Sequence, residues 1–141
     1  MKAVKILAIV LILYVGIVVA FESMLGFFQP QAGTTLVITT TDKQGMAHDR
    51  VVSRLDSNGA LYVAANHWPR AWYRQALQNP HVQATLNGAK IAFVAVPVTG
   101  AEDQRIESEH PHGIGFRLLT GFPPRHFLRL DPEVAAPTVN E

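Results

Sequence analysis

The sequence predicts a mainly β fold, a small antiparallel β-barrel with short helices, preceded by one apolar helix long enough to cross a membrane. An uncharged run lies near the start of the chain, and β-branched segments separated by hairpin turns follow it. Residues 29–132 are enough for one core and too few for two. We therefore expect an N-terminal segment over residues 1–28, one barrel domain over residues 29–132 and a disordered tail over residues 133–141.

The N-terminal segment carries no charged side chain from Ile6 to Phe21. This run rises only about 24 Å as a helix, but a helix continued to Phe28 rises about 34 Å and can span a hydrocarbon core of about 30 Å. A transmembrane anchor is the first interpretation. A cleaved signal peptide is the alternative, because Lys2 and Lys5 form a basic start and Val18-Val19-Ala20 offers small residues to a signal peptidase.

Charge bias around this segment predicts its orientation. Lys2 and Lys5 precede the apolar run, and the first basic residue after it is Lys43. By the positive-inside rule, we expect a single-pass protein with its N-terminus in the cytoplasm and its domain outside. If the segment is cleaved, the domain is expected to be secreted or periplasmic.

The domain opens with two hairpin signals. Residues 34–41 are almost all β-branched and end at the turn Asp42-Lys43-Gln44-Gly45, after which Ala47–Leu55 is expected to form the second strand. Ser57-Asn58-Gly59 then predicts a hairpin into a strand over Ala60–Ala65, because Asn-Gly suits positions with positive φ.

A helix and a second hairpin follow. Arg70 to Gln78 contains no helix breaker and places Trp72, Ala76 and Leu77 toward one side, so a short helix is expected there. The remaining expected elements are strands over Val82–Leu86 and Lys90–Val98 around Asn87-Gly88, a helix over Ala101–His110 and a last strand over His126–Leu130.

Composition excludes several classes of function. The chain has 12 Lys and Arg against 11 Asp and Glu and no basic stripe with interleaved aromatics, so no nucleic-acid partner is expected. The absence of cysteine excludes disulfides, a Cys nucleophile and thiolate metal sites. His110-Pro111-His112 brings two imidazoles together without a third ligand, so no metal site is predicted.

A longer pattern begins in the first expected helix of the domain. The run Trp72-Tyr73-Arg74-Gln75-Ala76-Leu77-Gln78-Asn79-Pro80-His81-Val82 precedes Asn87-Gly88 and then Val98-Thr99-Gly100-Ala101-Glu102. From roughly Leu36 to Glu102, the chain resembles the deazaflavin-dependent nitroreductase and quinone reductase family. The resemblance implies a split β-barrel of the FMN-binding, pyridoxamine-phosphate-oxidase type, which commonly forms a homodimer that shares the cofactor site.

The resemblance also implies a site for FMN or a deazaflavin, with the phosphate end at the turn after the first strand and the ring near the loop before Trp72. His48 stands where family members carry an arginine, so bidentate phosphate binding is lost at that position. No catalytic acid or base can be named. The candidate cofactor-binding residues are Lys43, Gln44, Gly45, His48, Arg50, Asn66, Trp72 and Tyr73.

Simpler interpretations of the same residues stay open. Lys43-Gln44-Gly45 is also typical of a solvent-exposed hairpin turn, and Trp68, Trp72 and Tyr73 are also typical core anchors. Three arginines are expected to face solvent, although one of them, Arg125, could rim a pocket together with His126. These arginines are Arg70, Arg74 and Arg125.

Together, the apolar segment and the resemblance imply a membrane-anchored flavin- or deazaflavin-dependent oxidoreductase that transfers hydride to a quinone or nitro-type acceptor. The alternative is a non-catalytic split-barrel module that binds a lipid, haem or a protein partner. An outward-facing domain favours the alternative, because reductants for a flavin are scarce outside the cytoplasm. A cytosolic domain would restore the supply of cofactor, against the lysine bias.

Overall fold

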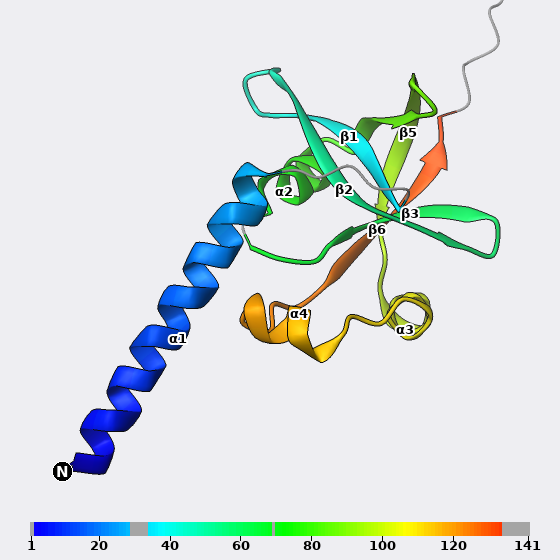
Figure 1. The fold of residues 1–141 in the computed structure, drawn as a ribbon. Helices are drawn as coiled ribbons and strands as arrows, with labels where there is room; N and C mark the ends of the chain where they lie inside the picture. The colour runs from blue at the N-terminus through cyan, green and yellow to red at the C-terminus, as the bar shows by residue number, and fades with distance from the viewer. Residues whose placement is uncertain (1, 29–33, 69, 134–141) are drawn as a thin grey trace, which may run out of the picture.

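The computed structural model describes residues 2–28, 34–68 and 70–133, so the start of the expected domain and the expected disordered tail from residue 134 lie outside the described residues. Helix α1 (Lys2–Phe27) comes first, and within the described residues six strands then close into an antiparallel barrel in the order β1-β2-β3-β6-β5-β4 (Figure 1). The strands are β1 (Thr35–Thr41), β2 (Ala47–Ser57), β3 (Ala60–Ala65), β4 (His81–Leu86), β5 (Ala89–Pro97) and β6 (His126–Pro132). The helices outside the barrel are α2 (Ala71–Gln78), α3 (Gly100–Glu109) and α4 (Ile114–Leu119).

Both Asn-Gly hairpins form where the sequence predicts them. Asn58 and Gly59 have φ of 50° and 76°, and Asn87 and Gly88 have φ of 51° and 82°. Two consecutive positive φ values are the geometry that matches a two-residue turn to the twist of its strands. The hairpins β2–β3 and β4–β5 pair in continuous register from these turns.

The barrel interior holds the main core. Ile38, Val63, Ala84 and Leu128 are fully buried there, one from each of four strands. Helix α2 packs its Trp72 and Ala76 against this core, and the Thr40 hydroxyl donates a hydrogen bond of 2.7 Å to Gln75 Oε1. The expectation that Leu77 shares this face is wrong, because Leu77 lies one position out of helical phase and is exposed.

A second, smaller core lies on the outer surface of β3 and β6. Helix α3 covers that surface with Ile106, which is fully buried against Tyr62, Val98 and Phe127. The Tyr62 hydroxyl donates to Glu102 Oε1 of the same helix at 2.8 Å, so its polar end is satisfied. The two cores explain why side chains on both faces of β3 are buried.

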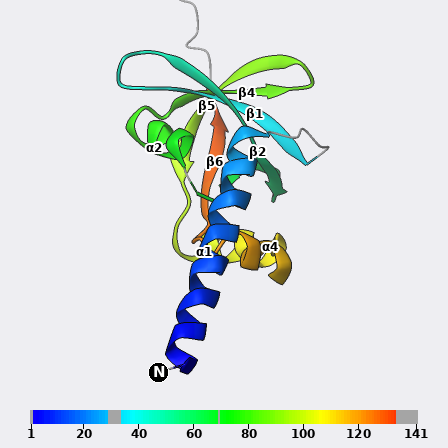
Figure 2. The ribbon, with the colours of Figure 1, turned by 60° about the vertical axis from the view of Figure 1, so that its left-hand side comes forward.

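Helix α1 is the long apolar element expected from the sequence, and it is apolar enough to cross a membrane. It leaves the barrel near α2 and passes beside α4 (Figures 1 and 2). One stripe of α1 is at least half-buried against the domain, and the rest of its surface is exposed. The stripe comprises Tyr14, Val18, Phe21, Glu22, Leu25 and Gly26.

Two expectations fail outside the barrel. Helix α4 was not predicted, because it is only one and a half turns long and contains Gly115. Arg70 and Arg125 were expected to face solvent, but the side chains of both are buried. Arg74 is exposed, as expected.

Candidate cofactor pocket

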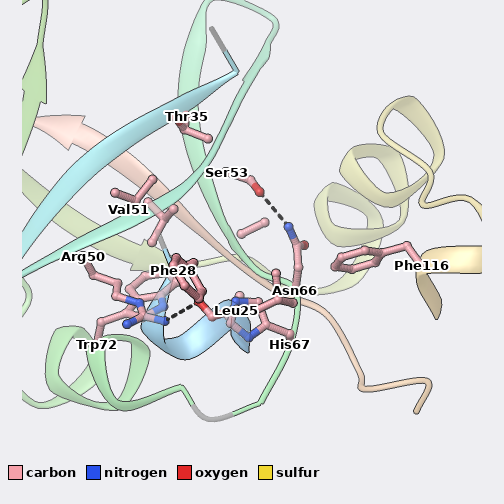
Figure 3. A pocket seen from close by; sticks show the side chains of 13 residues that line it. Leu25, Phe28, Thr35, Arg50, Val51, Ser53, Asn66, His67, Trp72 and Phe116 are labelled. Atoms are coloured by element: carbon pink, nitrogen blue, oxygen red, sulfur yellow. Dashed lines mark hydrogen bonds between the residues drawn. The ribbon is translucent and has the colours of Figure 1, made fainter. Parts of the chain in front are cut away.

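A cavity of about 180 Å³ lies where α1 meets the barrel, and we call it the α1 pocket. Strands β2 and β3 form its floor, Trp72 of α2 closes one side, and Leu25 and Phe28 from the end of α1 lie over it. Phe116 reaches toward it from α4 (Figure 3). The lining is mostly apolar, with the polar groups of Arg50, Ser53, Asn66 and His67 converging on it.

Arg50 ties β2 to the end of α1. Its Nη1 donates to the Gly26 carbonyl at 2.9 Å, and its Nη2 lies 3.4 Å from the Leu25 carbonyl. The last carbonyls of a helix have no partner within the helix and carry partial negative charge, so a guanidinium at this position is stabilising. Arg50 therefore caps α1 while its side chain lines the pocket.

Asn66 is held in place from two sides. Its amide nitrogen donates to Ser53 Oγ at 2.8 Å (Figure 3), and its carbonyl oxygen accepts a 3.0 Å hydrogen bond from Arg125 Nε. Arg125 in turn donates through Nη1 to Glu107 at 2.9 Å and to the His110 carbonyl at 2.7 Å. Burial lowers the pKa of the Arg125 guanidinium, and the nearby Glu107 carboxylate opposes that shift.

Glu22 is the one acidic residue of α1, and its side chain is only 8% exposed. Its Oε2 lies 3.2 Å from His67 Nδ1, which also lies 2.8 Å from the Trp68 carbonyl. An ionisable residue in an otherwise apolar helix is costly unless it faces a partner inside the protein. A lone acid directly after the apolar run is the sequence signal that could have indicated that α1 docks through this face.

Tyr73 does not line the α1 pocket. Its ring stacks on His126 with centroids 5.3 Å apart, and burial raises the pKa of Tyr73 and lowers the pKa of His126. Nearby, the Arg70 guanidinium lies 4.5 Å from the centre of the Trp68 ring, a cation–π contact. This cluster packs α2 onto β6, so His126 lies beside α2 and not in the pocket.

In the hairpin turn that was expected to hold a phosphate, the backbone N–H groups already donate hydrogen bonds to Asp42. Asp42 Oδ1 accepts hydrogen bonds from the backbone N–H groups of Gln44 and Met46, both at 2.9 Å. Asp42 Oδ2 lies 2.7 Å from His48 Nε2, and these hydrogen bonds, that from His48 first, lower the pKa of Asp42. A carboxylate thus occupies the position where a cofactor phosphate would bind these amides.

The eight candidate residues are therefore divided among four places. Arg50, Asn66 and Trp72 line the α1 pocket, and His48 joins Arg50 and Trp72 along a neighbouring groove of about 300 Å³. The turn residues Lys43, Gln44 and Gly45 are exposed at the tip of the β1–β2 hairpin, and Tyr73 belongs to the α2–β6 packing. A cofactor-binding role for all eight stays a prediction.

The α1 pocket suits part of a flavin or deazaflavin. Its aromatic wall and the Asn66 amide match a planar ring with polar edges, whereas its volume is below the 300–1,000 Å³ of ordinary ligand pockets. The guanidinium that lines it, Arg50, already binds α1. The lining residues thus fit a cofactor ring as they stand. They could bind a phosphate only if Arg50 released the carbonyls of α1.

Sequence reasoning missed the pocket residues that come from outside the barrel. Leu25 and Phe28 lie in and just after a helix interpreted only as an anchor or a signal peptide, and Phe116 belongs to the unpredicted α4. Neither helix lies within the stretch that carries the family resemblance. For Phe116, no sequence signal distinguishes a pocket residue from any other apolar side chain.

A second cavity, of about 320 Å³, lies behind α4 and is called the α4 cavity. Arg125, His112 and Arg117 supply its basic groups, and Asp103 and Glu107 supply its acidic ones. Burial, followed by the positive charges of Arg125 and Arg117, lowers the pKa of His112 to about 4. Within the described residues, His112 Nε2 is buried without a hydrogen-bond partner.

Comparison with known proteins identifies the fold of the chain. No protein-family model and no curated protein match the chain. Among solved structures, an F420-H2-dependent reductase is 17% identical with a TM-score of 0.54, covering 70% of this chain and 95% of its own. HutZ, a haem storage protein of Vibrio cholerae, is 18% identical with a TM-score of 0.54, covering 82% and 87%. A protein described as a domain-swapped dimer is 17% identical with a TM-score of 0.56, covering 72% and 82%. The chain has the split β-barrel fold of these proteins.

Proposed function

We propose that this split-barrel protein is anchored in a membrane by α1 and binds an FMN- or deazaflavin-type cofactor in the α1 pocket, for hydride transfer to a quinone or nitro-type acceptor. The observation that carries the proposal is the meeting of Arg50, Asn66 and Trp72 in one cavity at the end of an apolar helix. The fold shared with an F420-H2-dependent reductase supports it. The lysine bias supports a domain outside the cytoplasm.

When bound, the cofactor supplies the hydride chemistry, and the chain supplies binding and orientation. Trp72 would wall the ring, and the Asn66 amide, fixed by Ser53 and Arg125, would orient a polar edge of it. Leu25 and Phe28 would cover the ring with apolar side chains on the side of α1. His67 lines the pocket and connects it to Glu22 of α1.

A homodimer belongs to the same proposal. The α1 pocket is too small for a whole cofactor, and one similar structure is described as a domain-swapped dimer. A partner subunit would supply the missing wall. If so, cofactor affinity should rise with protein concentration, and sedimentation of the full chain in detergent should show dimers where binding is strongest.

The test is a titration of the full chain in nanodiscs with FMN and with a deazaflavin, followed by quenching of tryptophan fluorescence. Trp72 lines the α1 pocket, so saturable quenching is expected. The variant R50Q should weaken binding if the phosphate reaches Arg50, and K43A should weaken it if the phosphate lies at the hairpin turn. No saturable binding of either cofactor would refute the oxidoreductase proposal.

Haem binding is the second candidate function. HutZ, a haem storage protein, shares the fold, and His67 places an imidazole at the α1 pocket. Haem added to the full chain should then give a sharp Soret band that is lost in H67A and kept in H81A, because His81 lies at an exposed position of β4. Equal spectra for the two variants would exclude His67 as the ligand.

A further inference from the structure

The free part of α1 is too short to cross a membrane alone. From Lys2 to Leu13 all side chains are exposed, and from Tyr14 onward one stripe lies against the domain. The stretch Lys2–Leu13 rises about 18 Å, whereas the hydrocarbon core is about 30 Å thick. If α1 spans the bilayer, the rest of its membrane-spanning length must be the part that has the domain packed beside it.

Helix α4 is the neighbour of α1 at that level. The Tyr14 hydroxyl donates to the Leu118 carbonyl at 2.9 Å, and the Phe21 and Phe116 rings meet edge to face at 6.2 Å. Gly121 lies so close to Val18 that an added Cβ would be 3.0 Å from Val18 Cγ1. These contacts extend over about 10 Å of the α1 axis, just below the end of the helix that meets the barrel.

Four large apolar side chains in and just after α4 are exposed. Ile114 is 71% exposed, Leu118 51%, Leu119 40% and Phe122 46%. Phe122 has a φ of 55°, which is strained for a bulky residue. Its ring lines the α4 cavity and is still partly exposed. The one charged residue from Ile114 to Phe122 is Arg117, whose exposed side chain places its guanidinium 5.5 Å from the centre of the Phe122 ring. A side chain of this length can turn its charge to the lipid headgroups.

We propose that Ile114–Phe122 lies in the membrane leaflet nearest the domain, as a second membrane contact beside α1. This inference rests on the proposed anchoring by α1. The apolar side chains of the segment would sit among the acyl chains as those of an interfacial helix do, with Arg117 at the headgroups. The domain is then partly sunk in the leaflet, with the α1 pocket close to the lipid interface.

Continuity favours lipid over a second copy of the chain as the cover of this surface. The apolar side chains of α4 lie beside the apolar, exposed surface of α1, with the two helices in direct contact. A second copy that covered α4 would therefore be inside the same leaflet and would have to displace lipid from α1 as well. Lipid covers both without any further contact.

The test uses the natural absence of cysteine. The single-cysteine variants L118C and I114C, each labelled with the polarity-sensitive fluorophore NBD, are reconstituted as full chains into phosphatidylcholine vesicles with nitroxides on the acyl chains. I9C on α1 serves as the membrane reference, and M46C, 61% exposed on the β1–β2 turn, serves as the aqueous reference. Labels at positions 118 and 114 should show a blue shift and a loss of fluorescence comparable to position 9, while position 46 shows neither.

The other outcomes separate the possible failures. Quenching at position 9 with water-like emission at positions 114 and 118 would overturn the α4 contact and leave the anchor intact. No quenching at position 9 would refute the anchor and, with it, this inference. A blue shift at position 118 without quenching would show that protein, such as a second copy, covers α4 instead of lipid.

Discussion

Arg50 shows at the residue scale how one side chain joins the domain to its apolar helix. Because it binds the last carbonyls of α1, we expect R50Q to release the end of the helix at a cost of about 1.5–3 kcal/mol, the range for hydrogen bonds to charged groups. Hydrogen exchange of the full chain should become faster over residues 22–28 and stay unchanged in the barrel.

R54Q is the matched control, because Arg54 lies on the same strand and pairs with Asp56 at the surface. It should leave exchange over residues 22–28 as in the wild type. Equal exchange of R50Q and wild type would show that Arg50 does not hold α1.

His112 predicts an acid-sensitive stability. Its pKa is lowered to about 4 in the folded chain, against about 6.5 when unfolded, so the unfolded state binds the proton more strongly between these values. The stabilising effect of neutral His112 is complete above about pH 6.5 and is lost as the pH falls toward 4. The full loss corresponds to about 3 kcal/mol.

The measurement is the unfolding free energy of the full chain in detergent at pH 7 and pH 4.5. H112Q cannot titrate and should show a smaller acid loss than the wild type, whereas H81Q, changed at an exposed position, should behave as the wild type does. The same acid loss in H112Q and wild type would assign the effect to other groups.

At the element scale, the hairpins depend on backbone geometry that a side chain opposes. We expect G88A to destabilise the domain by about 1–2 kcal/mol, because Gly88 has a φ of 82° and an L-residue is strained there. G113A is the control, since Gly113 has a φ of −61° and open space around it. Denaturant unfolding compares the two, and an equal effect would refute the strain argument.

The hairpins were predictable because their signals are local. Asn58-Gly59 and Asn87-Gly88 fix their turns by their own conformational preferences, and the β-branched strands beside them follow. Helix α4 has no comparable signal, since contacts with Tyr14 and Phe21, roughly a hundred residues earlier in the chain, hold it. Short helices of this kind form through tertiary packing and not through propensity.

The residues of the candidate site were likewise predictable only where the sequence signal is local. Trp72 was identified through a contiguous pattern and Asn66 through its place in the loop before it, and both line one cavity. Arg125 was expected in solvent because a lone arginine is usually exposed. It is buried because Asn66, Glu107 and the His110 carbonyl converge on it from three separate segments, which single-sequence patterns do not show.

On the scale of the whole molecule, the end of α1 limits the space available to a ligand. Phe28 lines the α1 pocket, so a cofactor must share this space with its ring. We expect F28A to raise cofactor affinity by up to about tenfold, or about 1.4 kcal/mol, in the fluorescence titration. F27A is the matched control, because Phe27 is 82% exposed, and its affinity should equal that of the wild type. Weaker binding by F28A would show that the ring holds the ligand.

The stripe from Tyr14 to Gly26 has a further consequence for how the protein meets other molecules. A domain on a flexible tether tumbles and presents every face in turn, but α1 is in contact with α4, β2 and the loop after β3. Inserted in a bilayer, α1 would hold the barrel at a fixed distance from the membrane and at a fixed tilt. Encounters with an acceptor dissolved in the lipid would then be a search in two dimensions, at a constant distance between the pocket and the plane in which the acceptor diffuses.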